Sequence, residues 1–144
     1  AAFKTYYTDH CKEATAPYPG IMELLKTLQE HEIPMAIVSN KNDAAVKRLA
    51  ADFFEGIISV AIGERTGVRK KPAPDTVFTA LEELGESADS AVYVGDSEVD
   101  LQTAANSGMD CISVAWGFKG RAFLEKEGAS HIVDTPEEII RFLI

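Results

Sequence analysis

Two carboxylates follow a buried strand at a spacing that suits a metal site. Asp96 comes directly after the apolar run Ala91-Val92-Tyr93-Val94-Gly95, and Asp100 stands four residues later. Polar side chains at the carboxyl end of a strand face the crevice where open α/β sheets bind ligands, and carboxylate oxygens are the ligands that Mg²⁺ prefers. We therefore expect Asp96 to bind Mg²⁺ directly. We expect Asp100 to be a catalytic residue that orients a water on the metal or the ammonium of Lys71.

Polar residues at two earlier positions complete this arrangement. Ser39 ends the apolar run Met35-Ala36-Ile37-Val38 and is followed by Asn40, while Lys71 lies directly before Pro72. A transition state of phosphoryl transfer spreads negative charge over its oxygens, so it needs fixed donors and cations around it. We expect Ser39 and the backbone N–H of Asn40 to bind phosphate. Lys71 would bind phosphate and act in catalysis, with Pro72 fixing its backbone.

Each of these features also has a plain structural explanation. Gly95-Asp96 can be a simple turn, Ser39-Asn40 the polar start of a loop, and Lys71 part of a solvated cluster with Arg69 and Lys70. These explanations weaken when the features are taken together, because all of them fall near the carboxyl ends of predicted strands. The joint pattern favours a binding site.

The order of these residues resembles a known family. A strand-end Ser39, then Lys71-Pro72, then Gly95-Asp96 with Asp100 is similar to the second, third and fourth motifs of the haloacid dehalogenase superfamily of phosphohydrolases. The segments Tyr18-Pro19-Gly20-Ile21, Ser39-Asn40-Lys41 and Trp116-Gly117-Phe118 look most like its phosphoglycolate phosphatase-like branch. The resemblance implies an Mg²⁺-dependent phosphatase of a small phosphorylated metabolite such as phosphoglycolate, acting through an aspartyl-phosphate.

The first motif of that family, an Asp-x-Asp that carries the nucleophile, does not occur in this sequence. We therefore predict that the chain alone is catalytically incomplete and inactive. The alternative is a non-catalytic phosphate-binding or scaffold domain of the same fold. A receiver-type signalling domain also places acidic residues and a Lys-Pro around Mg²⁺, but there the acidic residues come first, whereas here Ser39 and Lys71 precede Asp96.

Helical and strand-like patterns alternate along most of the chain, as in a doubly wound parallel α/β sheet. Residues 17–144 are predicted to form this Rossmann-like core. Helical stripes begin at Ile21, Val46, Val77 and Val99, and the last helix is expected to start at Pro136 with a capping box. The strands are predicted at 35–39, 56–62, 91–94, 111–115 and 131–133.

The N-terminal residues show a different pattern. Phe3, Tyr6, Tyr7 and His10 are spaced as on one face of a helix. By the resemblance, residues 1–16 would be the remnant of an α-helical cap, and the first and central core strand would be missing. An N-terminal helix packed on its own domain is the alternative. We expect the two neighbouring strands, another chain through self-association, or an N-terminal fragment to close the gap, because unpaired buried backbone groups cost about 1–3 kcal/mol each.

Composition excludes several partners. The net charge of −9 and the pI of about 4.8 argue against nucleic acid and anionic membranes, which both require a basic surface. Cys11 and Cys111 lack metal-type spacing and are expected to be reduced thiols. No apolar run approaches a membrane-spanning length, so we expect a cytoplasmic protein.

Other candidates are weaker. The three histidines are dispersed, and no dinucleotide fingerprint is present, so we predict no nucleotide cofactor. Three residues follow the end of a predicted strand: Trp116, Phe118 and Arg121. They could line a substrate entrance, or they could simply pack in the core and form a surface loop.

Overall fold

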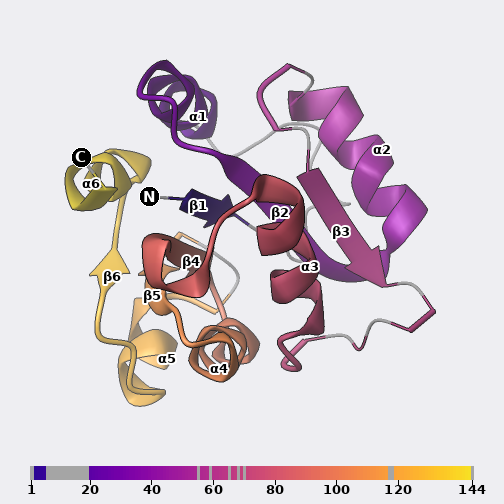
Figure 1. The fold of residues 1–144 in the computed structure, drawn as a ribbon. Coiled ribbons are helices and arrows are strands. Elements are labelled where there is room, and N and C mark those ends of the chain that lie inside the picture. Colours follow the sequence, from indigo (N-terminus) through magenta and orange to yellow (C-terminus); the bar gives the residue numbers. More distant parts are fainter. Residues whose placement is uncertain are drawn as a thin grey trace.

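Parallel strands form a central sheet with helices on both faces (Figure 1). The structure is a computed structural model that describes residues 2–5, 20–54, 56–58, 60–64, 66–67, 69, 71–116 and 119–143. In this part of the chain six strands are hydrogen-bonded in the order β3-β2-β1-β4-β5-β6, and every neighbouring pair is parallel. The predicted doubly wound α/β fold is confirmed. The strands are β1 (Ala2–Thr5), β2 (Met35–Asn42), β3 (Val60–Glu64), β4 (Ala91–Gly95), β5 (Asp110–Val114) and β6 (Ile132–Val133).

Apolar side chains on both faces of the sheet bury against different helices. On one face α1 (Ile21–Glu30), α2 (Asp43–Phe54) and α6 (Pro136–Leu143) share a core. On the other face α3 (Asp75–Leu84) and α4 (Glu98–Ser107) pack against the strands. A short helix, α5 (Arg121–Lys126), lies beside β6 (Figure 1). Both faces of a parallel sheet are thereby removed from water, which is why its strands read as continuous apolar runs.

Most predicted helix boundaries agree with the structure. Gly85 and Gly108 end α3 and α4 in the left-handed region, with φ of 73° and 74°. The last helix begins at Pro136 as expected. Its predicted capping box is different in detail, since the carboxylate of Glu138 accepts a hydrogen bond from the N–H of Asp134 at 2.8 Å, one residue before Thr135.

The third strand in the sequence, β3 at the edge of the sheet, is displaced from its predicted position. The sequence pattern predicts a strand over 56–62, whereas the described strand is Val60–Glu64. The N–H groups of Ile57 and Ile58 donate to the carbonyl oxygen of Phe54 at 2.9 and 3.0 Å and so close the end of α2. Two apolar residues that were predicted to lie in the strand therefore terminate α2, and the strand begins and ends later in the sequence than predicted.

The N-terminal prediction is corrected at four residues. Ala2–Thr5 form strand β1, so a helical stripe beginning at Phe3 is wrong for these residues. Tyr6, Tyr7 and His10 lie outside the described residues. The boundary between a cap remnant at 1–16 and a core at 17–144 stays a prediction.

The expectation of a missing central strand is also wrong. β1 lies between β2 and β4 and pairs with both, with Phe3 opposite Met35 and Val92, and Thr5 opposite Ile37 and Val94. The gap is closed by the chain's own N-terminal segment, which is none of the three ways that we considered. This segment satisfies the backbone groups of its two neighbours. It carries no carboxylate, since its residues are Ala, Phe, Lys and Thr.

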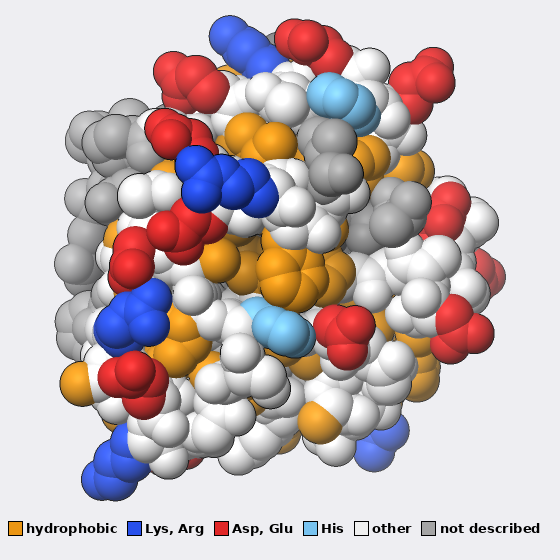
Figure 2. Space-filling model, turned by 90° about the vertical axis from the view of Figure 1, so that its left-hand side faces the viewer, with side chains coloured by type: hydrophobic (Ala, Val, Ile, Leu, Met, Phe, Trp, Pro, Cys, Tyr) orange, Lys and Arg blue, Asp and Glu red, His pale blue; other side chains and the backbone are white. Residues whose placement is uncertain are grey.

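The surface carries charges of both signs. Figure 2 shows the face on the α6 side, where lysines and arginines stand singly among acidic side chains around a central group of apolar ones. Over the described part of this face no basic patch forms. None of the helices in the described ranges has the length and apolar character needed to cross a membrane.

The pairing of β1 can be tested with proline. Lys4 lies opposite both Ala36 and Tyr93, so Lys4→Pro removes a backbone donor from the middle of the sheet. We expect the free energy of unfolding, measured by urea titration, to fall by about 1–3 kcal/mol. Lys4→Gln keeps the N–H and should change it much less. Equal values for the two variants would contradict the central position of β1.

Candidate functional site

The carboxylate of Asp100 lies at the centre of a hydrogen-bond network at the start of α4. Ser97 is the N-cap of this helix and forms a capping box with Asp100, the third helical residue. The Oδ2 atom of Asp100 accepts from the backbone N–H of Asp96 at 3.0 Å, from the N–H of Ser97 at 3.2 Å and from Ser97 Oγ at 3.0 Å. These contacts hold the turn after β4 closed.

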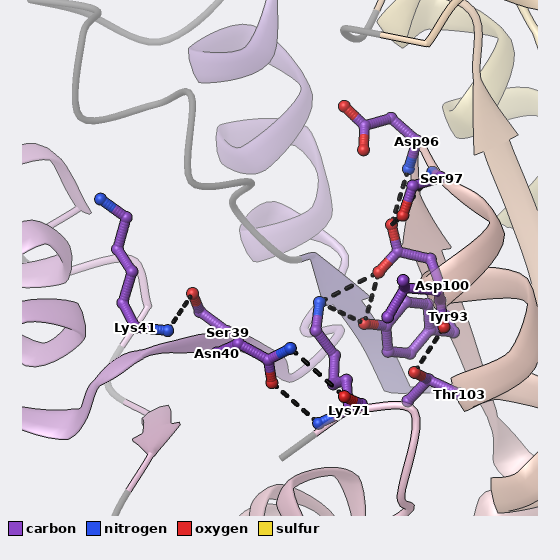
Figure 3. A network of polar contacts seen from close by, with 10 residues as sticks. Ser39, Asn40, Lys41, Lys71, Tyr93, Asp96, Ser97, Asp100 and Thr103 are labelled. Carbon is purple, nitrogen blue, oxygen red and sulfur yellow. Dashed lines mark hydrogen bonds and ion pairs between the residues drawn. The ribbon is translucent and has the colours of Figure 1, made fainter.

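The second oxygen of Asp100 binds two side chains from other elements. Lys71 Nζ and Tyr93 Oη each lie 3.0 Å from Asp100 Oδ1, and Lys71 Nζ also donates to Tyr93 Oη at 3.2 Å (Figure 3). The side chains of Lys71 and Asp100 are only 5% and 1% exposed. Asp100 thus accepts five hydrogen bonds, which uses its lone pairs. Its oxygens are committed to positioning the site, and coordinating a metal would require giving some of these bonds up.

Gly95 allows this close approach. A Cβ at position 95 would overlap with the carboxyl group of Asp100. The glycine before the strand-end aspartate is therefore required by packing, because any side chain would displace the carboxylate on which the network depends. The first position of the Gly-Asp-x-x-x-Asp motif is therefore a glycine because a side chain there would collide with the carboxylate of Asp100.

The backbone of Lys71 and Pro72 is held by two asparagines. Asn40 Oδ1 accepts from the N–H of Lys71 at 2.8 Å, and Asn40 Nδ2 donates to its carbonyl oxygen at 3.3 Å. On the other side Asn106 Nδ2, from α4, donates to the carbonyl oxygen of Pro72 at 2.8 Å. The Lys71–Pro72 peptide bond is cis. The side chain of Asn40 therefore positions Lys71, and phosphate binding through the backbone N–H of Asn40 stays a prediction.

Ser39 ends the buried part of β2 with a hydroxyl group that can still donate. The residue is 1% exposed, and its Oγ accepts from the N–H of Lys41 at 3.2 Å. Within the described residues no hydrogen bond uses the hydroxyl proton of Ser39. This proton is available for an anion at the carboxyl edge of the sheet.

Asp96 is placed as expected but does not complete a metal site. Its backbone N–H belongs to the Asp100 network, whereas Figure 3 shows its carboxylate directed away from Asp100 and Lys71. Among the residues that the structure describes, no three acidic, histidine or cysteine side chains gather in a way that could hold a metal ion. With the oxygens of Asp100 occupied, these residues do not by themselves fit Mg²⁺.

Tyr93 is the residue of the site that the sequence interpretation missed. It was read as one more apolar residue of the strand, but its side chain is fully buried and its hydroxyl joins Lys71 to Asp100. Burial, followed by the charge of Asp100, raises the pKa of Tyr93 well above its usual value, so the phenol stays protonated. A tyrosine in an otherwise aliphatic buried strand was the available signal, because a buried hydroxyl needs a partner.

The weaker candidates lie apart from this network. His31 contacts the carbonyl of Thr27 on α1, and the ring of His131 meets that of Phe142 edge-on. Arg121 pairs with Asp134 at 2.9 Å, and Trp116 packs partly buried against the core under α1 and α6. For Trp116 the structure favours packing over a substrate entrance. His10 and Phe118 lie outside the described residues.

Comparison with known proteins gives a consistent answer. Residues 1–114 match the sequence model of the haloacid dehalogenase-like hydrolases. A phosphoglycolate phosphatase of Pseudomonas savastanoi pv. phaseolicola is 32% identical over 133 residues, which are 89% of this chain and 47% of that protein. One from Aquifex aeolicus is 31% identical over 117 residues, covering 81% and 55%. The chain spans about half the length of these curated relatives.

Solved structures agree. A crystal structure from Lactobacillus delbrueckii subsp. bulgaricus, provisionally assigned as a phosphoglycolate phosphatase, superposes with a TM-score of 0.89 at 46% identity and covers 94% of this chain and 57% of that one. A core domain from Streptococcus pneumoniae, solved by NMR, has a TM-score of 0.72 at 22% identity and covers 99% and 93%. The latter likeness shows the fold alone.

The buried ion pair predicts a large effect of a small change. Asp100→Asn would remove the carboxylate that pairs with the buried ammonium of Lys71, so we expect the free energy of unfolding to fall by about 3–5 kcal/mol in urea titrations. Asp75→Asn is the matched control, because Asp75 pairs with Arg69 at 2.9 Å on the surface. The control should lose far less. Similar losses in both variants would contradict the network.

Proposed function

Because the chain belongs to the haloacid dehalogenase-like hydrolases, we propose that it is the core part of a phosphatase that hydrolyses a small phosphorylated metabolite. The relatives that the chain matches over about half of their length are phosphoglycolate phosphatases. Phosphoglycolate is therefore the substrate that we propose first. The phosphoryl group would bind at the carboxyl edge of the sheet, near Ser39 at the end of the buried part of β2 and Asp96 directly after β4.

The observation that supports this proposal most is the placement of Lys71. A lysine on a loop is brought into the buried site, its backbone is held by Asn40, and its ammonium is held by Asp100 and Tyr93. Burying an ammonium is costly, and the fold commits several polar groups to it. A fixed cation of this kind stabilises negative charge on a phosphoryl group and on a nearby carboxylate nucleophile.

Hydrolysis through an aspartyl-phosphate needs two groups that an Asp-x-Asp motif would supply, and this motif does not occur in the sequence. A carboxylate must attack phosphorus, and an acid must protonate the leaving oxygen before water cleaves the acyl-phosphate. β1 occupies the central position of the sheet without offering a carboxylate. We therefore propose that the chain by itself binds phosphate but does not turn over phosphate esters.

Mg²⁺ belongs to the proposal for the whole enzyme. Asp96 would supply one carboxylate ligand, and the remaining ligands would have to come from the nucleophile and from the phosphate itself. Mg²⁺ commonly binds through one or two carboxylates together with substrate phosphates. For this chain alone we expect Mg²⁺ to bind weakly unless phosphate is present.

A non-catalytic phosphate-binding or scaffold domain is the second candidate. It is favoured by one observation: β1 completes the sheet with a segment that has no acidic residue. Such a domain would keep Ser39, Lys71 and Asp96 as binding groups. The two candidates would differ in turnover by a protein in which a carboxylate nucleophile precedes this sequence.

Turnover tests the proposal most directly. Incubation of the 144-residue chain with 2-phosphoglycolate and Mg²⁺ should release no phosphate above the Asp96→Asn variant in a colorimetric phosphate assay. Release that depends on Mg²⁺ and is lost in Asp96→Asn would contradict the inactivity of the chain. A longer protein with the Asp-x-Asp motif should release phosphate, and failure there would favour the scaffold candidate.

Phosphate binding can be measured on the chain itself. In calorimetric titrations with inorganic phosphate and Mg²⁺, Ser39→Ala should weaken binding by about tenfold, since it removes a donor to a charged ligand. Lys71→Met should abolish it, and the exposed Lys126→Met is the matched control with unchanged affinity. Because Lys71→Met also leaves Asp100 unpaired, Ser39→Ala is the decisive variant. Unchanged affinity in Ser39→Ala would contradict the assignment of Ser39.

A further inference from the structure

One buried side chain links the lysine of the site to the carboxylate that holds it. Tyr93 stands in the middle of β4, and its side chain is fully buried among residues of the α3 and α4 face. The other side chains of β4 are aliphatic or absent, since the strand reads Ala-Val-Tyr-Val-Gly. A phenylalanine would fill the same volume, so the hydroxyl is the feature that needs an explanation.

The hydroxyl of Tyr93 closes a triangle of hydrogen bonds. It accepts from Lys71 Nζ at 3.2 Å and donates to Asp100 Oδ1 at 3.0 Å, while Lys71 Nζ reaches the same Oδ1 at 3.0 Å. The ammonium also lies 5.9 Å from the centre of the Tyr93 ring. The three residues come from β4, α4 and the loop before α3, so the triangle fixes a side chain against two separate elements.

A single ion pair would hold the ammonium less well. Lysine has a flexible stem of four carbons, and its ammonium can rotate about a single partner and still keep that contact. A second, neutral acceptor at a different angle defines the direction of the ammonium without competing for its charge. High burial and the neighbouring Asp100 carboxylate keep Tyr93 protonated, so it remains a donor to Asp100.

We propose that Tyr93 is a positioning residue for Lys71. The hydroxyl of Tyr93 directs the ammonium of Lys71 toward the place beside Ser39 where phosphate is proposed to bind. It acts through Lys71 and does not touch the substrate. The consequence for phosphate binding rests on the proposed function, whereas the hold on the ammonium does not. Asp100 and Tyr93 thus have separate tasks, with Asp100 supplying the countercharge and Tyr93 the direction.

The Tyr93→Phe variant separates the directing effect of the Tyr93 hydroxyl from the charge of Asp100. It keeps the ring and the Lys71–Asp100 ion pair but removes the hydroxyl. Thr76→Val is the matched control, because Thr76 is fully buried on α3 and its Oγ1 has no hydrogen-bond partner within the described residues. Both variants lose one buried hydroxyl, and only Tyr93→Phe loses one that contacts Lys71.

The test is ¹H–¹⁵N NMR of the lysine ammonium groups in the 144-residue chain without phosphate. We expect the Lys71 ammonium protons to exchange with water about tenfold faster in Tyr93→Phe and to keep their rate in Thr76→Val, since a hydrogen bond to a charged group is lost only in the first. Unchanged exchange and chemical shift of Lys71 in Tyr93→Phe would overturn the proposal.

Phosphate titration supplies the second readout. If the wild type binds phosphate, Tyr93→Phe should raise the dissociation constant by about tenfold with Thr76→Val unaffected. Equal affinity of Tyr93→Phe and wild type would overturn the directing role. If the wild type binds no phosphate while the exchange rates respond as expected, the proposed function fails and the hold of Tyr93 on Lys71 stands.

Discussion

The rest of the site depends on the hydrogen bonds that the carboxylate of Asp100 accepts. This carboxylate accepts hydrogen bonds from the backbone after β4, from the N-cap serine of α4 and from the buried Lys71 and Tyr93. A buried lysine and aspartate gain little from their attraction alone, because both lose their hydration. Here the added donors offset that loss. One carboxylate therefore ends a strand, begins a helix and holds a cation.

The sheet brings these groups together. Ser39 lies in β2 and Asp96 directly follows β4. The two residues are more than fifty positions apart in sequence, and β1 lies between their strands in the sheet. Parallel strands end at the same edge, so polar side chains from distant segments meet there. β1 contributes backbone pairing to both neighbours. It contributes no carboxylate, because its residues are Ala, Phe, Lys and Thr, so the nucleophile of the proposed phosphatase does not come from this strand.

Asn40 and Asp100 show how tertiary contacts refine an interpretation based on residue type. Asp100 was expected to orient either a water on the metal or the ammonium of Lys71, and its carboxylate contacts that ammonium and accepts four further hydrogen bonds. Asn40 was expected to act through its backbone N–H, whereas its side chain binds the backbone of Lys71. Sequence spacing predicts that these residues meet, because strand ends converge. It does not predict which atoms pair, because that depends on the direction of each side chain after packing.

The amino-acid sequence by itself determined the family, the alternation of helices and strands, and the residues that gather at the carboxyl edge. These follow from local periodicity and from motifs whose order along the chain can be read directly. Tertiary structure alone decided that Ala2–Thr5 enter the centre of the sheet, that Tyr93 joins Lys71 to Asp100, and that Gly95 makes room for a carboxylate. Strand pairing and close approach are contacts between segments far apart in sequence, so no local pattern carries them.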